Sequence, residues 1–369
     1  MKTITFECEI VTPMFLAGAD GRTPELRPAS IKGALRFWWR AMHGDLGIDE
    51  LRMQEAELFG GGGENARRSL LSIKLGKNKT KTQANASIGI QNGTGIGYLL
   101  YSSLFMNKRD CIQPDVKQTF ELSLVAKNTK VLEESLKAFA CLLFFGGFGS
   151  RTRRGAGSIF IKKIEGNAVL SVKDILKVFE TKDVETKEQL QKHIEVYLKP
   201  FIQSKPADGR YSALNGASLY LLNPEDNWKK SLEIIGGKFK SERSNIQSEI
   251  GKTPNFGFPI QHKNTGFMML GGTVSYNDHD RKAIKNSDRR ASPLIISVIK
   301  TENNFYFPLV LHFQGELLPN GQKIIDKKAG EWTDSTVKAV INKREESPDP
   351  MYVQEKFLDK LRWAIHFTL

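Results

Sequence analysis

The sequence has little cysteine and no cluster of metal-binding side chains. Its three cysteines, Cys8, Cys111 and Cys141, are scattered, odd in number and form no CxxC pair. That pattern argues against a disulfide framework or a zinc site and favours a reducing compartment. The six histidines form no cluster, and the paired acids that two-metal phosphoryl chemistry needs are missing. We therefore expect neither a metal nor another cofactor.

Long apolar runs are also missing. The longest, 138–145, is far too short to cross a bilayer. The first ten residues alternate like a strand and lack the apolar centre of a signal peptide. Gly251-Lys252-Thr253 lacks the earlier glycine of a phosphate-binding NTPase loop, so we do not interpret it as one. The sequence predicts a cytoplasmic protein without a membrane partner.

Positive charge is in excess. Lys and Arg number 54 against 41 Asp and Glu, which leaves a formal net charge of +13 over 369 residues. The chain is long enough for two domains with hydrophobic cores. Such a basic balance favours a polyanionic partner, of which nucleic acid is the commonest.

Hydrophobic periodicity in the first half follows the order strand, helix, strand, strand, helix, strand. That is the βαββαβ order of a ferredoxin-like, RRM-like domain, so we predict an α+β fold with such a domain over 1–166. The less regular remainder, 167–369, is expected to be a second, degenerate ferredoxin-like domain with helical insertions. In it we expect a strand at 218–222, a strand pair at 293–300 and 305–313, and no clear fourth strand. The helices expected there span 172–180, 186–198, 228–250, 333–344 and 353–367.

The segment SIKGALRFWWRA at 30–41 is typical of an amphipathic helix, with Ser30 as a candidate N-cap. One arc is apolar. Lys32, Arg36, Arg40 and His43 share the opposite arc, with no acid from this segment among them. Cations grouped in this way favour phosphate binding, although a solvated basic face is the alternative. Gly33 lies beside the cations, where a missing side chain would let a ligand approach the backbone.

Two loops combine glycine with arginine. The segment 146–158 contains five glycines and three arginines between an apolar helix and a strand. Glycines let backbone N–H groups approach phosphates, and arginines pair with phosphate oxygens as forks. A helix cap and turn would account for one or two glycines, but not for the neighbouring arginines. The segment 60–69 repeats the theme more weakly and is equally consistent with a flexible turn.

The stretch LRPASIKGALRFWWRA at 26–41 resembles the signature of the RAMP superfamily of CRISPR proteins. Its Trp-Trp-Arg ending is similar to that of the first subunit of type III-B, or Cmr-type, effector complexes. Supporting matches lie at 58–61, 146–157 and 290–294. The resemblance implies two ferredoxin-like domains, association with other Cmr subunits, and contact with target RNA and the 3′ region of crRNA. It also implies that the subunit is not itself catalytic.

These observations define a set of candidate RNA-binding residues. Trp39, on the border of the helix, could either stack on a base or pack at the helix edge. The candidates are Arg27, Ser30, Lys32, Gly33, Arg36, Trp39, Arg40, Arg67, Arg68, Gly147, Gly149, Arg151, Arg153, Arg154, Arg289 and Arg290.

Two other functions stay open on the sequence. The first is a metal-independent endoribonuclease like the crRNA-processing relatives, for which His43 is the only well-placed candidate base. The second is a basic scaffold that contacts only protein. The clustered cations predict strongly salt-dependent RNA binding, and the absence of a base-reading pattern predicts weak sequence preference.

Overall fold

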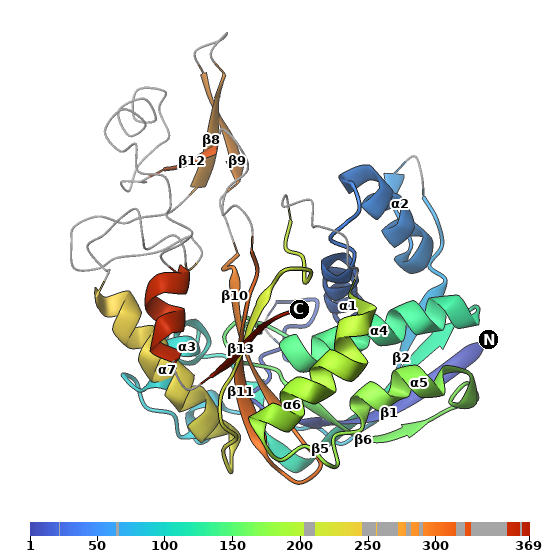
Figure 1. Cartoon of the computed structure of the whole chain (residues 1–369), viewed down its shortest axis with the longest axis horizontal. Helices are drawn as coiled ribbons and strands as arrows, with labels where there is room; N and C mark the ends of the chain where they lie inside the picture. The colour runs from blue at the N-terminus through green and yellow to red at the C-terminus, as the bar shows by residue number, and fades with distance from the viewer. Residues whose placement is uncertain are drawn as a thin grey trace. The chain divides into compact units, whose positions relative to one another are not determined.

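The computed structural model describes residues 1–21, 23–63, 66–202, 211–245, 256, 272–277, 282–287, 291–314, 322–325, 353–361 and 364–369. The chain divides into two compact units (Figure 1). The first comprises Met1–Gly237, Ile295–Phe313 and Trp363–Leu369. The second comprises Lys238–Leu294 and Gln314–Arg362. Within the second unit, β8 (Gly272–Asn277), β9 (Lys282–Ser287) and β12 (Gln322–Ile325) form a sheet in the order β12-β8-β9.

The first sheet belongs to the first half of the chain. Its strands lie in the order β2-β5-β1-β6, and each neighbouring pair is antiparallel. Helices α1 and α4 pack against each other, and both contact the sheet. The order strand, helix, strand, strand, helix, strand expected in residues 1–166 is present, with α2 as a further helix. The bounds are β1 Lys2–Ile10, α1 Pro28–Met42, α2 Ile48–Phe59, β2 Leu71–Asn78, β5 Asp115–Ala126, α4 Thr129–Phe145 and β6 Ile159–Glu165.

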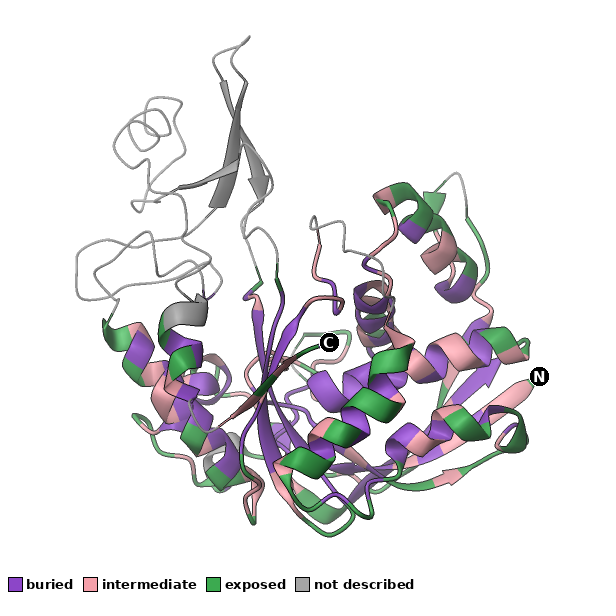
Figure 2. Ribbon diagram, viewed as in Figure 1, coloured by how far each residue is buried: buried purple, intermediate pink, exposed green. Residues whose placement is uncertain are grey.

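Alternation along the strands explains why this sheet forms. On β1, Ile4, Phe6 and Cys8 point into the core and are fully buried, while Thr3 and Thr5 between them are only half-buried. Figure 2 shows buried residues along the strands of the first unit and on one side of its helices. Asn128 caps α4, because its side chain accepts a hydrogen bond from the Val131 N–H at 2.9 Å.

The second sheet lies in the second half of the chain and repeats the strand order of the first. Its strands are β7 (Ser218–Leu221), β10 (Leu294–Lys300), β11 (Tyr306–His312) and β13 (Ile365–Thr368). They lie in the order β10-β11-β7-β13. In both sheets the strand that comes first in sequence lies between the third and the fourth.

One prediction for the second half was wrong, and another is confirmed only as a series of short helical turns. The closing helix does not continue to residue 367, because Ile365–Thr368 is β13, which pairs with β7. This strand supplies the fourth position for which no clear strand was expected. The helix expected at 172–180 is broken into short 3₁₀ turns around α5 (Lys173–Leu176). The helix expected at 333–344 lies outside the described residues.

Both sheets belong to the first compact unit. The Ser297 hydroxyl of β10 donates to the Phe144 carbonyl at 3.0 Å. Lys300 pairs with Glu9 of β1 at 2.5 Å, and both side chains are buried. The boundary expected between residues 166 and 167 therefore runs between two sheets of one unit.

Shorter and peripheral elements complete the described structure. They are β3 Thr82–Gln83, α3 Gly95–Leu99, β4 Cys111–Ile112, α6 Lys187–His193 and α7 Trp228–Asn245, with 3₁₀ or π turns at Asn85–Ile88, Ser102–Met106, Leu170–Val172, Lys177–Phe179, Ile194–Leu198, Lys199–Phe201, Val353–Leu358 and Asp359–Leu361. No helix in the described ranges is long and apolar enough to cross a membrane.

Candidate nucleic-acid interface

Helix α1 is the centre of the candidate interface. It begins at Pro28, which occupies the first helical position, and Arg27 is the N-cap. Ser30 therefore lies inside the first turn and is exposed, so the predicted Ser30 cap is wrong. Arg27 is half-buried and lies 4.0 Å from Glu25. The buried residues of the helix are Ile31, Leu35, Trp38, Trp39, Ala41 and Met42.

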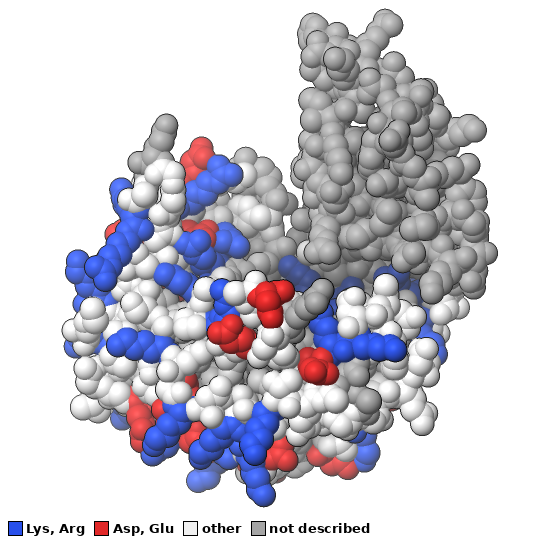
Figure 3. Space-filling view, turned by 180° about the vertical axis from the view of Figure 1, so that it is seen from behind, with Lys and Arg blue, Asp and Glu red and all other residues white. Residues whose placement is uncertain are grey.

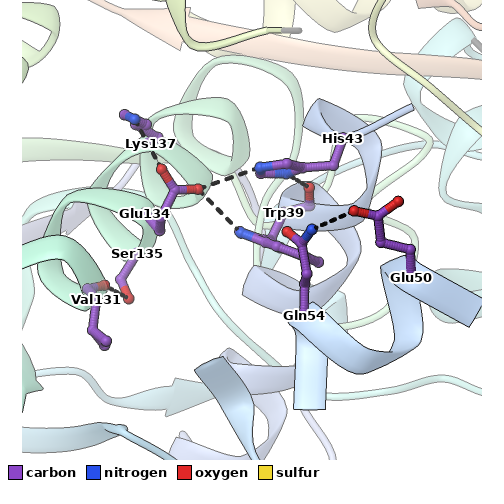
Figure 4. Close-up of polar contacts among 8 residues, drawn as sticks. All are labelled: Trp39, His43, Glu50, Gln54, Val131, Glu134, Ser135 and Lys137. Carbon is purple, nitrogen blue, oxygen red and sulfur yellow. Dashed lines mark hydrogen bonds and ion pairs between the residues drawn. The ribbon is translucent and has the colours of Figure 1, made fainter. Parts of the chain in front are cut away.

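Trp39 belongs to the core rather than to the helix border. Its side chain is 3% exposed, and its indole N–H donates to the Glu134 carboxylate of α4 at 3.2 Å. His43 stacks on the Trp39 ring with centroids 4.3 Å apart (Figure 4). In this arrangement the ring faces of Trp39 are covered, as the packing alternative requires.

The carboxylate of Glu134 joins α1 to α4 (Figure 4). His43 Nε2 lies 3.4 Å from it, and the Lys137 ammonium donates to it at 2.9 Å. Burial opposes the charge on Glu134, but the hydrogen bonds from His43 and Lys137 outweigh burial and lower the pKa to about 2. The other ring nitrogen of His43 lies 2.8 Å from the Trp39 carbonyl. Both nitrogens of His43 are thus engaged within the protein.

The cations of α1 share one side of the helix, but an acid from α2 reaches two of them. Arg40 pairs with Glu55 at 2.8 Å, and Arg36 Nε lies 3.5 Å from the same carboxylate oxygen. Arg36 also donates to the Gly60 carbonyl. Burial, and after it the charge of Arg36, lower the pKa of Lys32. Gly33 is exposed, and an added Cβ would meet nothing within 4 Å.

The loop at 60–69 follows α2 and presents its arginines outward. Gly60 ends the helix with a φ of +85°, and Gly61 pairs with Arg67 through backbone hydrogen bonds. Arg67 and Arg68 are exposed. An added Cβ at Gly62 would meet nothing within 4 Å. This loop therefore has room around its glycine and two accessible cations.

The loop at 146–158 is instead packed into the domain. The Phe148 N–H donates to the Gly157 carbonyl at 2.9 Å, and the Ser150 N–H donates to the Phe15 carbonyl at 2.8 Å. A Cβ at Gly147 would lie 2.5 Å from the Gly157 carbonyl oxygen. Gly149 has a φ of +94° and lies against the Phe15 backbone. These glycines are required by chain packing.

The arginines of the same loop also make internal contacts. Arg151 has a φ of +64° and donates to the Leu99 carbonyl at 2.6 Å. The Arg153 guanidinium lies over the rings of Phe37 and Phe313, at 5.1 and 6.0 Å from their centroids. Arg154 donates to the Arg153 carbonyl at 3.1 Å. All three arginines are nevertheless half-exposed.

Helix α1 brings the two loops together. Arg36 contacts the first loop at Gly60, and Phe37 contacts Arg153 of the second. The structure thus gathers cations from three segments that are distant in sequence. Arg289 and Arg290 lie outside the described residues. On the face in Figure 3, Lys and Arg form several groups separated by acids and neutral residues.

The sequence reasoning missed Glu55 and Glu134, the acids that organise this region. Glu55 lies one turn from Leu51 and one turn from Leu58, both buried. An acid on the apolar side of a helix needs a cationic partner, so this spacing was an available signal. For Glu134, the i,i+3 spacing to Lys137 indicated only a local pair, because its other partners, Trp39 and His43, come from α1, with Trp39 95 residues earlier in the chain.

The rest of the described chain offers few other groups suited to chemistry. The three cysteines are free and buried. Burial raises the pKa of each thiol, to about 12 for Cys111, so the thiols are protonated at neutral pH. Among the described residues, no group of three or more His, Cys, Asp or Glu is placed to hold a metal ion.

Comparison with known proteins finds a family model and related proteins that are similar to this chain. Residues 7–160 match the model of the RAMP superfamily. The chain is 29% identical over 183 residues to CRISPR system Cmr subunit Cmr1-2 of Pyrococcus furiosus, covering 44% of this chain and 97% of that protein. It is 25% identical over 322 residues to subunit Cmr1-1 of the same organism, covering 85% of this chain and 88% of that protein.

Solved structures share the fold at low sequence identity. The crystal structure of apo Cmr1 from Pyrococcus furiosus superposes with a TM-score of 0.60 at 18% identity, covering 90% of this chain and 92% of that one. A cryo-EM structure of Type III-B Cmr-beta bound to cognate target RNA and AMPPnP contains a chain with a TM-score of 0.57 at 14% identity. That match covers 98% of this chain and 99% of the other.

Proposed function

Because residues 7–160 of this chain match the model of the RAMP superfamily, we propose that the protein is an RNA-binding subunit of a type III-B CRISPR (Cmr) ribonucleoprotein in antiviral defence. Its partners are crRNA, at or near the 3′ region, target RNA, and other Cmr subunits. The names of its relatives and the target RNA in the similar Cmr-beta structure support this assignment. The subunit has no chemistry of its own.

The observation that carries the proposal is the meeting of three basic segments around α1. Lys32, Arg36 and Arg40 come from the helix, Arg67 and Arg68 from the first loop, and Arg153 and Arg154 from the second. Cations spaced along a surface neutralise successive phosphates, and the counterions released make binding favourable and salt-dependent.

The fold we propose is a pair of ferredoxin-like domains. The common strand order of the two sheets supports it, as does a helix after the first strand of each, α1 after β1 and α7 after β7. In this arrangement the boundary near residue 166 separates two structural repeats within one compact unit.

The outer face of the first sheet suits RNA less well than α1 does. It carries a groove of about 230 Å³, with Lys77, Lys79 and Lys163 facing Glu7, Glu121 and Glu165. The charges balance, so a polyanion gains little there. Phe120, the aromatic residue at this groove, is 1% exposed and offers no face for base stacking.

The contacts of His43 support a non-catalytic role. A general base must have a free nitrogen within reach of the ribose 2′-hydroxyl. Both nitrogens of His43 contact protein groups, and its side chain is only 12% exposed. Incubating the full chain with crRNA repeat RNA in EDTA tests this. We expect intact RNA, and site-specific cleavage that His43→Ala abolishes would establish the endoribonuclease instead.

RNA binding is tested by removing the most accessible cations. In fluorescence anisotropy with a single-stranded RNA, we expect the triple variant Lys32→Ala, Arg67→Ala, Arg68→Ala to reduce the log–log salt slope by ~2, or ~0.7 for each lost phosphate contact. A matched control removes the exposed cations Lys130, Lys173 and Lys192, which lie on α4, α5 and α6. Equal effects of the two triple variants, or a flat salt response of the unmodified chain, would refute the proposal and favour a scaffold that contacts only protein.

A further inference from the structure

Glu55 is an internal anion at the centre of the basic surface. Its side chain is 14% exposed, whereas those of Arg36 and Arg40 are 33% and 37% exposed. The carboxylate therefore lies deeper than the two guanidinium groups that it pairs with. One carboxylate oxygen, Oε1, reaches both arginines. It lies 2.8 Å from Arg40 Nη1 and 3.5 Å from Arg36 Nε.

We propose that Glu55 masks Arg36 and Arg40, so that the free subunit contacts RNA through Lys32, Arg67 and Arg68 while the two arginines stay paired with the carboxylate. This inference rests on the proposed RNA-binding function and names the residue that limits it. Glu55 thus limits affinity, because it keeps the isolated chain from binding RNA with all of its cations.

The geometry of the arginines supports the mask. Arg36 and Arg40 are one helical turn apart, so one carboxylate reaches both. Arg36 is further fixed by its bond to the Gly60 carbonyl and by the Phe59 ring, 5.8 Å from its guanidinium carbon. A phosphate that approaches from solvent must compete with a charge-assisted hydrogen bond that is already formed and partly shielded from water.

The net charges of the two groups of residues also favour first contact with the unmasked cations. One carboxylate against two guanidinium groups leaves one net positive charge, whereas Lys32, Arg67 and Arg68 contribute three. Arg67 and Arg68 are exposed, and Lys32 is half-exposed on the same side of α1 as Arg36. A chain of phosphates therefore meets the unmasked cations first. The masked pair adds to binding only when the charge of Glu55 is removed.

The test replaces Glu55 by glutamine, which keeps the shape and an acceptor oxygen for Arg40. With a single-stranded RNA in fluorescence anisotropy, we expect Glu55→Gln to steepen the log–log salt slope by ~0.7 to ~1.4, for one or two additional phosphates. At 0.1 M salt this corresponds to an affinity about 5- to 25-fold higher. The matched control is Glu57→Gln, the same charge change at an exposed position of α2, and it should leave the slope unchanged.

A double-mutant cycle separates the mask from general electrostatics. In the unmodified chain, Arg40→Gln should leave the salt slope unchanged, because Arg40 does not contact RNA there. In the Glu55→Gln background the same substitution should remove about half of the gain. If Arg40→Gln alone lowers the slope by ~0.7, the mask is wrong. This second variant decides the question even if Glu55→Gln fails to fold.

The failure of the mask differs from failure of the proposed function. If the unmodified chain binds RNA with a steep salt slope and Glu55→Gln matches it or binds more weakly, the mask is refuted and the RNA-binding function stands. If neither chain binds RNA, the proposed function fails as well. If Glu57→Gln gives the same gain as Glu55→Gln, the effect is one of net charge, and the mask is again refuted.

Discussion

The two glycine–arginine loops have similar compositions and opposite structural roles. In the loop at 146–158, Gly147 and Gly149 lie against backbone, and Arg151 donates into the protein. In the loop at 60–69, Gly62 is open, and Arg67 and Arg68 are exposed. The loop with the stronger motif is therefore the more tightly built, and the loop with the weaker motif is the more accessible.

Glycine next to arginine can therefore have either of two structural roles. A glycine admits a ligand only where the space that its Cβ would occupy is empty. Where another segment fills that space, the glycine serves packing. Arginine behaves similarly, since its five donors can satisfy carbonyls of the protein as readily as phosphate oxygens. Four experiments test whether the two loops differ in this way.

The largest effect is expected from a Cβ in the packed loop. Gly147→Ala places a carbon 2.5 Å from the Gly157 carbonyl oxygen, a backbone atom that cannot move aside easily. We expect the free energy of unfolding in urea to fall by about 3 kcal/mol. Gly62→Ala in the first loop is the matched control and should change it by less than ~0.5 kcal/mol. If the Gly147→Ala chain were stable but bound RNA more weakly, Gly147 would serve RNA binding rather than packing.

Lowering the pH tests the ion pairs of Glu134, which hold α4 in place. This helix leads directly into Gly146, the first residue of the packed loop. The pKa of Glu134 is about 2 instead of 4.5. Since the folded pKa is depressed, its contribution is present above pH 4.5 and is lost as pH falls toward 2. Relative to Glu134→Gln, the unmodified chain should lose about 2 kcal/mol of unfolding free energy between pH 7 and pH 3. Parallel pH profiles for the two chains would contradict the ion-pair account.

Substituting the arginines of each loop, and measuring both RNA affinity and stability, separates their roles. Arg67→Ala with Arg68→Ala should weaken RNA binding about 25-fold at 0.1 M salt, because two phosphate contacts are lost. The melting temperature should stay unchanged. Arg151→Ala should do the opposite, lowering stability by about 1 kcal/mol through loss of the bond to the Leu99 carbonyl while the salt slope stays constant. Anisotropy and thermal melts of the same preparations distinguish the two.

Much of the fold could be predicted because its signals are local. Period-two alternation on β1 and β5 and the apolar run of α4 appear directly in the residues, and the order of the main strands and helices of residues 1–166 was predicted correctly. The prediction missed strand β13 because it has only four residues, Ile365–Thr368, and their alternation is too short to stand out from the helix expected over 353–367. Its partner β7 lies far away in sequence, and only that pairing makes it a strand.

The candidate site was predictable in composition but not in contacts. The cations of α1 do share one face, as the helical period indicated. The acids that pair with them come from α2 and α4, so the helix alone could not show that Glu55 reaches Arg36 and Arg40. Trp39 was placed on the border of the apolar arc, yet Glu134 provides a partner for its indole N–H and allows it to be buried.

The smallest effect is expected at Gly33, where α1 itself can be compared with both loops. It is a helical glycine with empty space where a Cβ would lie. Alanine should therefore stabilise the helix by about 0.5–1 kcal/mol, the ordinary preference over glycine in a helix interior. If RNA approaches the backbone beside Lys32, the same methyl group obstructs it, and we expect RNA affinity to fall about threefold despite the gain in stability. Gly237→Ala on α7, likewise an open position, is the control that should not change RNA binding. Unchanged affinity in Gly33→Ala would mean that RNA contacts the cations of α1 only through their side chains.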